Sequence, residues 1–195
     1  MTKIIALPGG IGSGKTYVAS VFEKFAGIPC FYSDIEAKII MNNNIFVKEK
    51  IISFFGNESY KNDVLDTVFL RNKIFNSQNE LKKINKIVHG QVNIKFKKWL
   101  DIQDSKYVLK ETAILFEHGY DKNVDLSILV VAPKKVRIER IIKRDNIAVK
   151  KIEKIIANQW DDKKKIHYSD YFIENLSKFT TIKKVKKLID VFSVI

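Results

Sequence analysis

The sequence predicts an α/β fold in which a five-stranded parallel sheet is flanked by helices. Short apolar runs of the kind that form buried parallel strands alternate with segments of helical periodicity. A glycine-rich stretch joins the first strand to the first helix, and one long helical block separates the second strand from the third. The expected strands are residues 3–7, 30–32, 107–109, 124–132 and 171–173.

The glycine-rich stretch, residues 9–16, fits the pattern G-x-x-x-x-G-K-[ST] of a P-loop. Glycines let backbone N–H groups converge on a phosphate, and the following helix N-terminus favours negative charge. The strand before it and the helix after it disfavour the alternative of a glycine-rich turn without a ligand. The expected ATP-binding residues of the loop are Gly10, Ile11, Gly12, Ser13, Gly14, Lys15 and Thr16.

Two residues of the loop carry specific chemistry. Lys15 supplies a positive charge for the β- and γ-phosphates of ATP, and the Thr16 hydroxyl is the expected ligand of Mg²⁺. Glu111 follows the third strand, where a carboxylate can hold Mg²⁺ directly or through water. The alternative for Glu111 is an ordinary surface glutamate.

Length and composition bound the class of protein. A chain of 195 residues is expected to form one domain, and no apolar run reaches the roughly 20 residues of a membrane span. The N-terminus enters a strand at once, so no signal peptide is expected. The only cysteine, Cys30, cannot form an internal disulfide. We therefore expect a cytoplasmic protein with no membrane partner.

The net charge of +13 predicts attraction to anions. Only four of the 35 basic residues are arginines, and three of them, Arg137, Arg140 and Arg144, fall within eight residues. Because arginine grips phosphate with a planar fork, this cluster predicts a phosphate contact. The lysines are spread over many helices and the aromatic residues are scattered, so no nucleic-acid partner is expected. A basic P-loop protein that binds nucleic acid stays as an alternative, which a salt-dependent gel shift would reveal.

The expected organisation is a single kinase domain with three parts. Residues 1–41, 101–143 and 166–195 form the nucleotide-binding core. Residues 42–100 are nearly all helical and are too long for a simple crossover, which indicates an inserted substrate subdomain. Residues 144–165 are basic and predict a mobile lid, with a solvated helical hairpin as the alternative. A lid that excludes water favours phosphoryl transfer to a small molecule.

Several further motifs resemble those of the dephospho-CoA kinase family over nearly the whole chain. These are the P-loop, the segment 33–38, residues 65–66 and 81–89, Ala113-Ile114-Leu115-Phe116-Glu117, the Arg140 to Asp145 segment, and the stretch from Gln159 to Asn175. The chain departs from the family pattern at Lys38, where arginine is usual, and at Gly90 and Ala113, where proline is usual.

The resemblance implies ATP-dependent phosphorylation of the ribose 3′-hydroxyl of dephospho-CoA, with ATP and Mg²⁺ required. Asp34 is then the candidate base; from its position alone it is also a good helix cap. Lys15 and Arg140 would neutralise charge, and Arg144 would close the lid.

The same resemblance implies the remaining contacts. Asn175 would lie near the adenine of ATP, and Lys38, His89 and Glu117 would contact the acceptor. For His89 and for Glu117 a structural role is equally open. A nucleoside or nucleoside-monophosphate kinase and an inactive P-loop scaffold are the remaining alternatives. We expect a monomer or a weak homo-oligomer.

Overall fold

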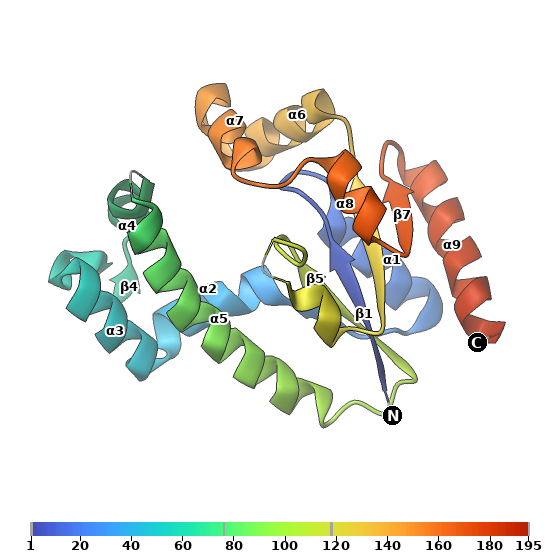
Figure 1. Ribbon diagram of the computed structural model, residues 1–195, viewed down its shortest axis with the longest axis horizontal. Helices are drawn as coiled ribbons and strands as arrows, with labels where there is room; N and C mark the ends of the chain where they lie inside the picture. Colours follow the sequence, from blue (N-terminus) through green and yellow to red (C-terminus); the bar gives the residue numbers. More distant parts are fainter. Residues whose placement is uncertain (1, 76, 118, 195) are drawn as a thin grey trace. The chain divides into compact units, whose positions relative to one another are not determined.

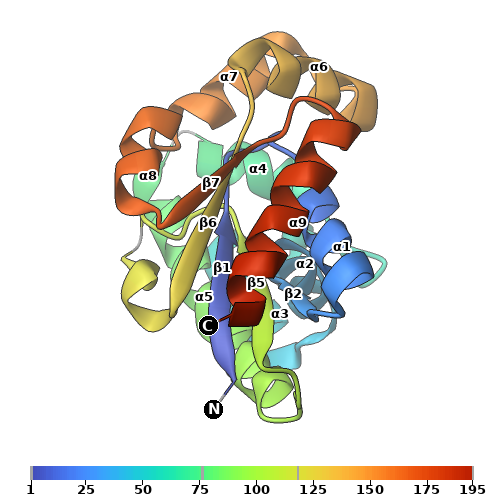
Figure 2. The ribbon, with the colours of Figure 1, turned by 90° about the vertical axis from the view of Figure 1, so that its right-hand side faces the viewer.

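The computed structural model, which describes residues 2–75, 77–117 and 119–194, contains a five-stranded sheet in the order β2-β5-β1-β6-β7 (Figures 1 and 2). All of its strand pairs are parallel, as predicted. The chain divides into two compact units, one of Met1–Tyr32 with Gln103–Ile195 and one of Ser33–Ile102. The strands are β1 (Lys3–Pro8), β2 (Cys30–Tyr32), β5 (Tyr107–Thr112), β6 (Leu126–Val131) and β7 (Tyr171–Glu174).

The register of the sheet aligns the carboxyl ends of three strands. Leu7 of β1 and Tyr32 of β2 both pair with Glu111 of β5. The sequence predicted β5 to end at residue 109, but the strand continues to Thr112, so Glu111 lies within it. The polar residues Lys110 to Thr112 still pair as a strand because neighbouring strands on both sides take their backbone hydrogen bonds.

Two helices, α1 (Lys15–Ala26) and α9 (Lys178–Val194), pack together on one face of the sheet (Figure 2). Apolar residues at helical spacing, such as Val18 and Phe22, are fully buried there. Phe22 and Phe192 stack with ring centroids 6.5 Å apart. This contact joins the helix that follows the P-loop to the helix nearest the C-terminus.

The opposite face of the sheet has a smaller apolar cluster of Ala6, Leu115, Phe116, Leu129 and Val131. The segment after β5, which includes the short helix η2 (Tyr120–Asn123), and helix α8 (Asp162–Tyr168) pack on this side. The cluster places residues 115–117 beside the strands that carry the candidate site.

Helices α6 (Lys134–Asp145) and α7 (Val149–Ala157) form a hairpin (Figure 1). Helix α6 ends because Asn146 takes the left-handed conformation, with φ of 50°. Ile141 and Ile152 are fully buried and anchor the two helices. Ion pairing between Lys134 and Glu153 adds an exposed contact of 3.1 Å.

The second unit is helical with one small hairpin. Its helices are α2 (Ser33–Asn43), α3 (Ile45–Phe55), η1 (Asn57–Ser59), α4 (Thr67–Phe75) and α5 (Gln78–Leu100). The sequence predicted residues 42–100 to be nearly all helical, but β3 (Tyr60–Lys61) and β4 (Val64–Leu65) pair antiparallel within them. Asn62 and Asp63 both adopt positive φ, of 48° and 65°, which is the geometry of a tight two-residue hairpin turn.

The core of this unit is formed by buried apolar residues of α3 and α5, including Val47, Ile51, Val88 and Val92. Glu36 of α2 and Lys95 of α5 form an ion pair that joins these two helices. Within the described ranges, no helix of either unit has the length and apolar content needed to cross a bilayer.

Candidate active site

The P-loop begins where β1 ends at Pro8 and merges into α1 at Lys15. Gly14 adopts the left-handed conformation, with φ of 90°, and a Cβ there would overlap the side-chain amide of Asn175. A Cβ on Gly10 would overlap the guanidinium of Arg137. The two glycines are therefore required because side chains from α6 and from the end of β7 approach the loop backbone.

Side chains behind the loop hold its carbonyl groups. Arg137 Nε donates to the Ile11 carbonyl at 2.8 Å, and the Ser13 carbonyl accepts from Asn175 Nδ2 at 2.8 Å and from Arg140 Nη1 at 3.2 Å. In a trans peptide the carbonyl and the next N–H point in opposite directions. The N–H groups of Gly12 and Gly14 are therefore directed away from these side chains, as a phosphate cradle requires.

Lys15, Thr16 and Glu111 converge at the carboxyl end of the sheet. Lys15 Nζ lies 3.7 Å from Glu111 Oε1, and the Thr16 hydroxyl donates to Glu111 Oε2 at 3.3 Å. Both side chains of the Lys15–Glu111 pair are buried. The register of β1 with β5 places these side chains together. It brings Thr16 close to Glu111, the two residues that the sequence predicted to hold a metal ion.

This donor set fits Mg²⁺. A hydroxyl and a carboxylate are hard oxygen ligands, and Mg²⁺ in phosphoryl-transfer sites takes its remaining ligands from phosphates and water. Among the described residues no group of three or more His, Cys, Asp or Glu is placed to hold a metal ion. A site of one carboxylate, one hydroxyl and bound phosphates needs no such group.

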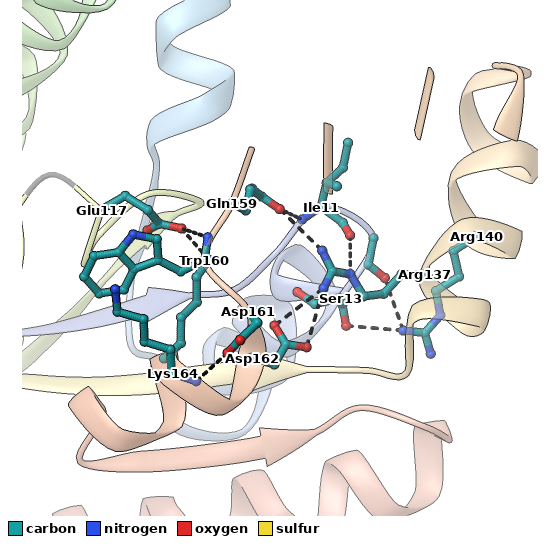
Figure 3. A network of polar contacts seen from close by, with 12 residues as sticks. Ile11, Ser13, Glu117, Arg137, Arg140, Gln159, Trp160, Asp161, Asp162 and Lys164 are labelled. Atoms are coloured by element: carbon teal, nitrogen blue, oxygen red, sulfur yellow. Dashed lines mark hydrogen bonds and ion pairs between the residues drawn. The ribbon is translucent and has the colours of Figure 1, made fainter. Parts of the chain in front are cut away.

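Arg137, which belongs to the arginine cluster predicted to contact phosphate, is the centre of a second cluster whose protein contacts were not predicted (Figure 3). Arg137 is 5% exposed, and its guanidinium contacts Ile11, Gln159 and Asp162. Gln159 Oε1 also accepts the N–H of Ile11 at 3.0 Å. The clustering of arginines in a lysine-rich chain was a signal for Arg137, but no sequence pattern pairs Arg137 with Gln159.

Arg140, Arg144 and Asn175, which were predicted to bind ATP, differ in their surroundings. Arg140 Nη2 donates to the Asn175 carbonyl at 2.9 Å. The Asn175 amide lies behind the loop, where its Oδ1 accepts from Thr181 Oγ1 at 2.9 Å. Arg144 is exposed and pairs with the adjacent Asp145 at 2.7 Å. The structure thus brings Arg140 and Asn175 to the loop and leaves Arg144 at the end of α6.

Glu117, a predicted acceptor contact, is held by residues of the predicted lid. Its Oε1 lies 2.7 Å from Nζ of Lys165, which is fully buried, and accepts from the Trp160 N–H at 3.2 Å. The part of the predicted lid from Gln159 to Lys165 is therefore anchored to the P-loop and to Glu117. Helix α7 is the part of the predicted lid that lies outside this anchor.

The remaining acceptor candidates belong to the second unit. Asp34 and Lys38 are exposed on α2, one helical turn apart, and His89 is half-buried in α5. Helix α2 begins at Ser33, so Asp34 lies in its first turn rather than at the cap position, and its charge favours the helix N-terminus. The expectation that Asp34 caps this helix is therefore wrong.

Cys30, on β2, is not a reactive thiol. Burial, together with the charges of Glu111 and Glu23, raises the pKa of the Cys30 thiol far above its ordinary value. Since the thiolate is the nucleophile, a raised pKa disfavours a covalent role for this half-buried thiol.

Comparisons with solved structures agree with this fold. A crystal structure of TT1252 from Thermus thermophilus matches with a TM-score of 0.86 and 24% identity, over 97% of each chain. Dephospho-CoA kinase from Campylobacter jejuni matches with a TM-score of 0.71 and 24% identity, over 99% of this chain and 98% of that one. Shikimate kinase from Acinetobacter baumannii shares the fold more distantly, with a TM-score of 0.58.

Sequence comparison identifies the family. The sequence model of the family described as dephospho-CoA kinase matches residues 3–180. The dephospho-CoA kinase of Fusobacterium nucleatum is 35% identical over 94% of this chain and 95% of its own length, and that of Bacteroides fragilis is 30% identical over 95% and 90%. With the P-loop, Lys15, Thr16 and Glu111 in place, these matches show that the chain belongs to the dephospho-CoA kinase family.

Proposed function

We propose that the chain transfers the γ-phosphoryl group of ATP to the ribose 3′-hydroxyl of dephospho-CoA, which gives coenzyme A and ADP. Its family carries dephospho-CoA kinase activity in coenzyme A biosynthesis. The observation that supports the reaction most directly is the family match over residues 3–180, joined to a P-loop whose Lys15 and Thr16 converge on Glu111.

On the donor side, residues 10–16 bind the phosphates of ATP. The N–H groups of Gly12 and Gly14 and the ammonium of Lys15 stabilise the negative charge of the phosphates. Thr16, with Glu111 directly or through water, would hold Mg²⁺, which would supply charge neutralisation at the phosphates. Asn175 supports the wall of the ATP site from behind the loop, beside the adenine.

On the acceptor side, Asp34 accepts the proton of the 3′-hydroxyl. The hydroxyl oxygen forms a bond to the γ-phosphorus, the bond to the bridging oxygen breaks, and ADP leaves with that electron pair. Support for Asp34 comes from the chain itself, because Asp34 follows Tyr32 at the end of β2 by two residues. Lys38, His89 and Glu117 bind the acceptor.

Arg140 stabilises the transferring phosphoryl group, and α7 with Arg144 forms a lid over the nucleotide. Arg140 already lies at the P-loop, where its guanidinium reaches the Ser13 carbonyl at 3.2 Å. The anchor at Gln159 and Lys165 restricts the proposed lid motion to residues 144–158. Closure of such a lid would exclude water and protect ATP from hydrolysis.

A coupled assay of ADP release tests the proposed reaction. The protein is supplied with ATP and Mg²⁺ and with dephospho-CoA, nucleosides or nucleoside monophosphates in turn. We expect ADP release with dephospho-CoA alone among these acceptors. Faster release with a nucleoside or a nucleoside monophosphate would favour the alternative kinase of the same fold. Gel filtration of the same sample measures its apparent mass and so tests the proposed monomer or weak homo-oligomer. Fractionation of cells tests the proposed cytoplasmic location.

A further inference from the structure

We infer that Arg137 and Gln159 are positioning residues, which hold the two peptide groups flanking Ile11 and thereby aim the N–H of Gly12 at the phosphates of the nucleotide. The inference rests on the proposed function only for the identity of the nucleotide as ATP or ADP. It assigns a role to two residues that lie outside the sets proposed above for ATP, acceptor and metal.

Three hydrogen bonds close a ring between Ile11, Arg137 and Gln159 (Figure 3). The N–H of Ile11 donates to Gln159 Oε1 at 3.0 Å, Arg137 Nη2 donates to the same oxygen at 3.3 Å, and Arg137 Nε donates to the Ile11 carbonyl at 2.8 Å. The N–H and the carbonyl of Ile11 belong to successive peptide groups. The ring therefore fixes both peptide planes, and the second of them carries the N–H of Gly12.

Arg137 is itself held in place, which the proposed role requires. Its Nη1 lies 3.4 Å from Asp162 Oδ2, so all three guanidinium nitrogens have partners. The Gly10 backbone packs so closely on the guanidinium that a Cβ would overlap it. Asp162 lies in the first turn of α8, whose N-cap Asp161 accepts from the Lys164 N–H at 2.6 Å. The ring is thus held on one side by the P-loop backbone at Gly10 and on the other by α8.

A lysine could not replace Arg137 in this arrangement. Its ammonium is a single point, whereas the three contacts of Arg137 lie along the planar fork of the guanidinium. Burial lowers the pKa of Arg137 and raises that of Asp162, and their mutual attraction opposes both shifts. Because a buried ion pair adds little net stability, the arrangement is better explained by the geometry it imposes on the loop.

Nucleotide binding distinguishes a positioning role from a purely structural one. We would prepare Arg137→Lys, Gln159→Leu and the double variant, with Lys134→Gln as the matched control. Lys134 also joins α6 to α7, through Glu153, but it does not touch the P-loop. The dissociation constant of Mg·ADP is measured by calorimetry and the unfolding midpoint by circular dichroism. Arg137→Lys keeps the positive charge and removes the planar guanidinium. Gln159→Leu removes the oxygen that accepts from both the Ile11 N–H and Arg137, at a half-buried position.

We expect each single variant to weaken Mg·ADP binding by about tenfold, the effect of one misdirected hydrogen bond in the cradle. Because the two residues share one ring, the double variant should be weaker than either single variant by no more than about threefold. Lys134→Gln should stay within about twofold of the parent protein, since its exposed ion pair contributes little. In the Arg137 and Gln159 variants the KM for ATP should rise, whereas the KM for the acceptor should stay close to that of the parent protein.

A lower unfolding midpoint with a Mg·ADP affinity equal to that of the control would overturn the inference, because the cluster would then only join α6 to α8. Additive effects of the two substitutions would also contradict it. If Arg137→Lys does not fold, the comparison of Gln159→Leu with the control still decides. A protein that binds Mg·ADP but leaves dephospho-CoA unchanged contradicts the proposed acceptor instead, and the ADP measurements then test the inference separately.

Discussion

At the residue scale, the site depends on a few side chains whose roles come from their surroundings. Glu111 meets both Lys15 and Thr16, and Arg140 and Asn175 share the Ser13 carbonyl. Each contact joins parts of the sequence that are far apart. A substitution at one of these residues therefore alters the geometry of the loop, whereas a substitution at an exposed lysine does not.

Replacing Asp34 by asparagine should abolish turnover and spare nucleotide binding. Asparagine keeps the shape of the side chain but cannot accept the hydroxyl proton, so kcat should fall by about 10²- to 10⁴-fold. The Kd of Mg·ADP should change by less than about twofold, since Asp34 lies outside the P-loop unit. Asp101→Asn, a charge-matched change at the end of α5, serves as the control. Activity within tenfold of the parent protein would remove Asp34 from the role of base.

Arg140→Lys should slow catalysis while the protein stays folded. Lysine keeps the positive charge but loses the planar fork, so we expect kcat to fall by about 10- to 100-fold. Arg71→Lys, at an exposed position of α4, is the matched control. Single-turnover kinetics at saturating ATP would separate the chemical step from binding. An unchanged rate of that step would mean that Arg140 only supports the loop.

At the element scale, the sequence predicted the strands and most helices because their apolar spacing is local information. Helix α3, for example, lies in the block predicted to be helical, and Asn44 caps it and Gly56 ends it. The hairpin of β3 and β4 was not predicted because its strands have two residues each and depend on positive φ at Asn62 and Asp63. The P-loop, Lys15 and Thr16 could be read from one motif, but the ring at Ile11 joins residues 148 positions apart and leaves no local pattern.

The start of α4 has its own pH dependence. Asp66 Oδ1 accepts the N–H groups of Val68 and Phe69 at 3.0 and 2.9 Å, and its Oδ2 lies 2.6 Å from Lys61 Nζ. The bond from Lys61, followed by the bond from Phe69, lowers the pKa of Asp66. A lowered carboxyl pKa stabilises the folded state above the unfolded value of about 4, and this contribution is lost as pH falls through the folded value.

Urea unfolding of the parent protein and Asp66→Asn between pH 7 and pH 2.5 measures this contribution. The difference in unfolding free energy between the two proteins should be constant near neutral pH and should shrink below about pH 4. Lys61→Met removes the hydrogen bond that contributes most to the lowered pKa of Asp66. Its unfolding free energy should therefore depend less on pH below about pH 4 than that of the parent protein. Parallel stability curves for all three proteins would contradict the assignment.

At the scale of the whole molecule, the two units divide the proposed substrates between them. The P-loop and its supports lie in the unit of residues 1–32 and 103–195, whereas Asp34, Lys38 and His89 lie in the unit of residues 33–102. The second unit is a continuous segment with its own buried core. The donor site is therefore built by a discontinuous part of the chain, and the acceptor candidates by a continuous insertion, apart from Glu117.

Hydrogen exchange should separate these two halves. Mg·ADP at about 100 times its Kd should stabilise the unit that binds it by about 2.7 kcal/mol, which slows exchange in residues 9–16 and in the strands beside them. Dephospho-CoA alone should instead protect amides within residues 33–102. Exchange is followed by mass spectrometry of peptic peptides for each ligand and for both together. Equal protection of both units by Mg·ADP alone would contradict the division.

The hydrogen bond from Asn175 to the Ser13 carbonyl, 162 positions apart in the sequence, has a consequence for biosynthesis. At a translation rate of about 5–20 residues per second, residue 175 is made roughly 8 to 32 s after residue 13. During that interval the Ser13 carbonyl of the nascent loop lacks Asn175, the nearer of its two side-chain donors. The other donor, Arg140, follows only after residue 131 has completed β6, the neighbour of β1. A ribosome-bound chain that already contains the whole motif is therefore expected to be unable to hold ATP until its last strand has joined the sheet.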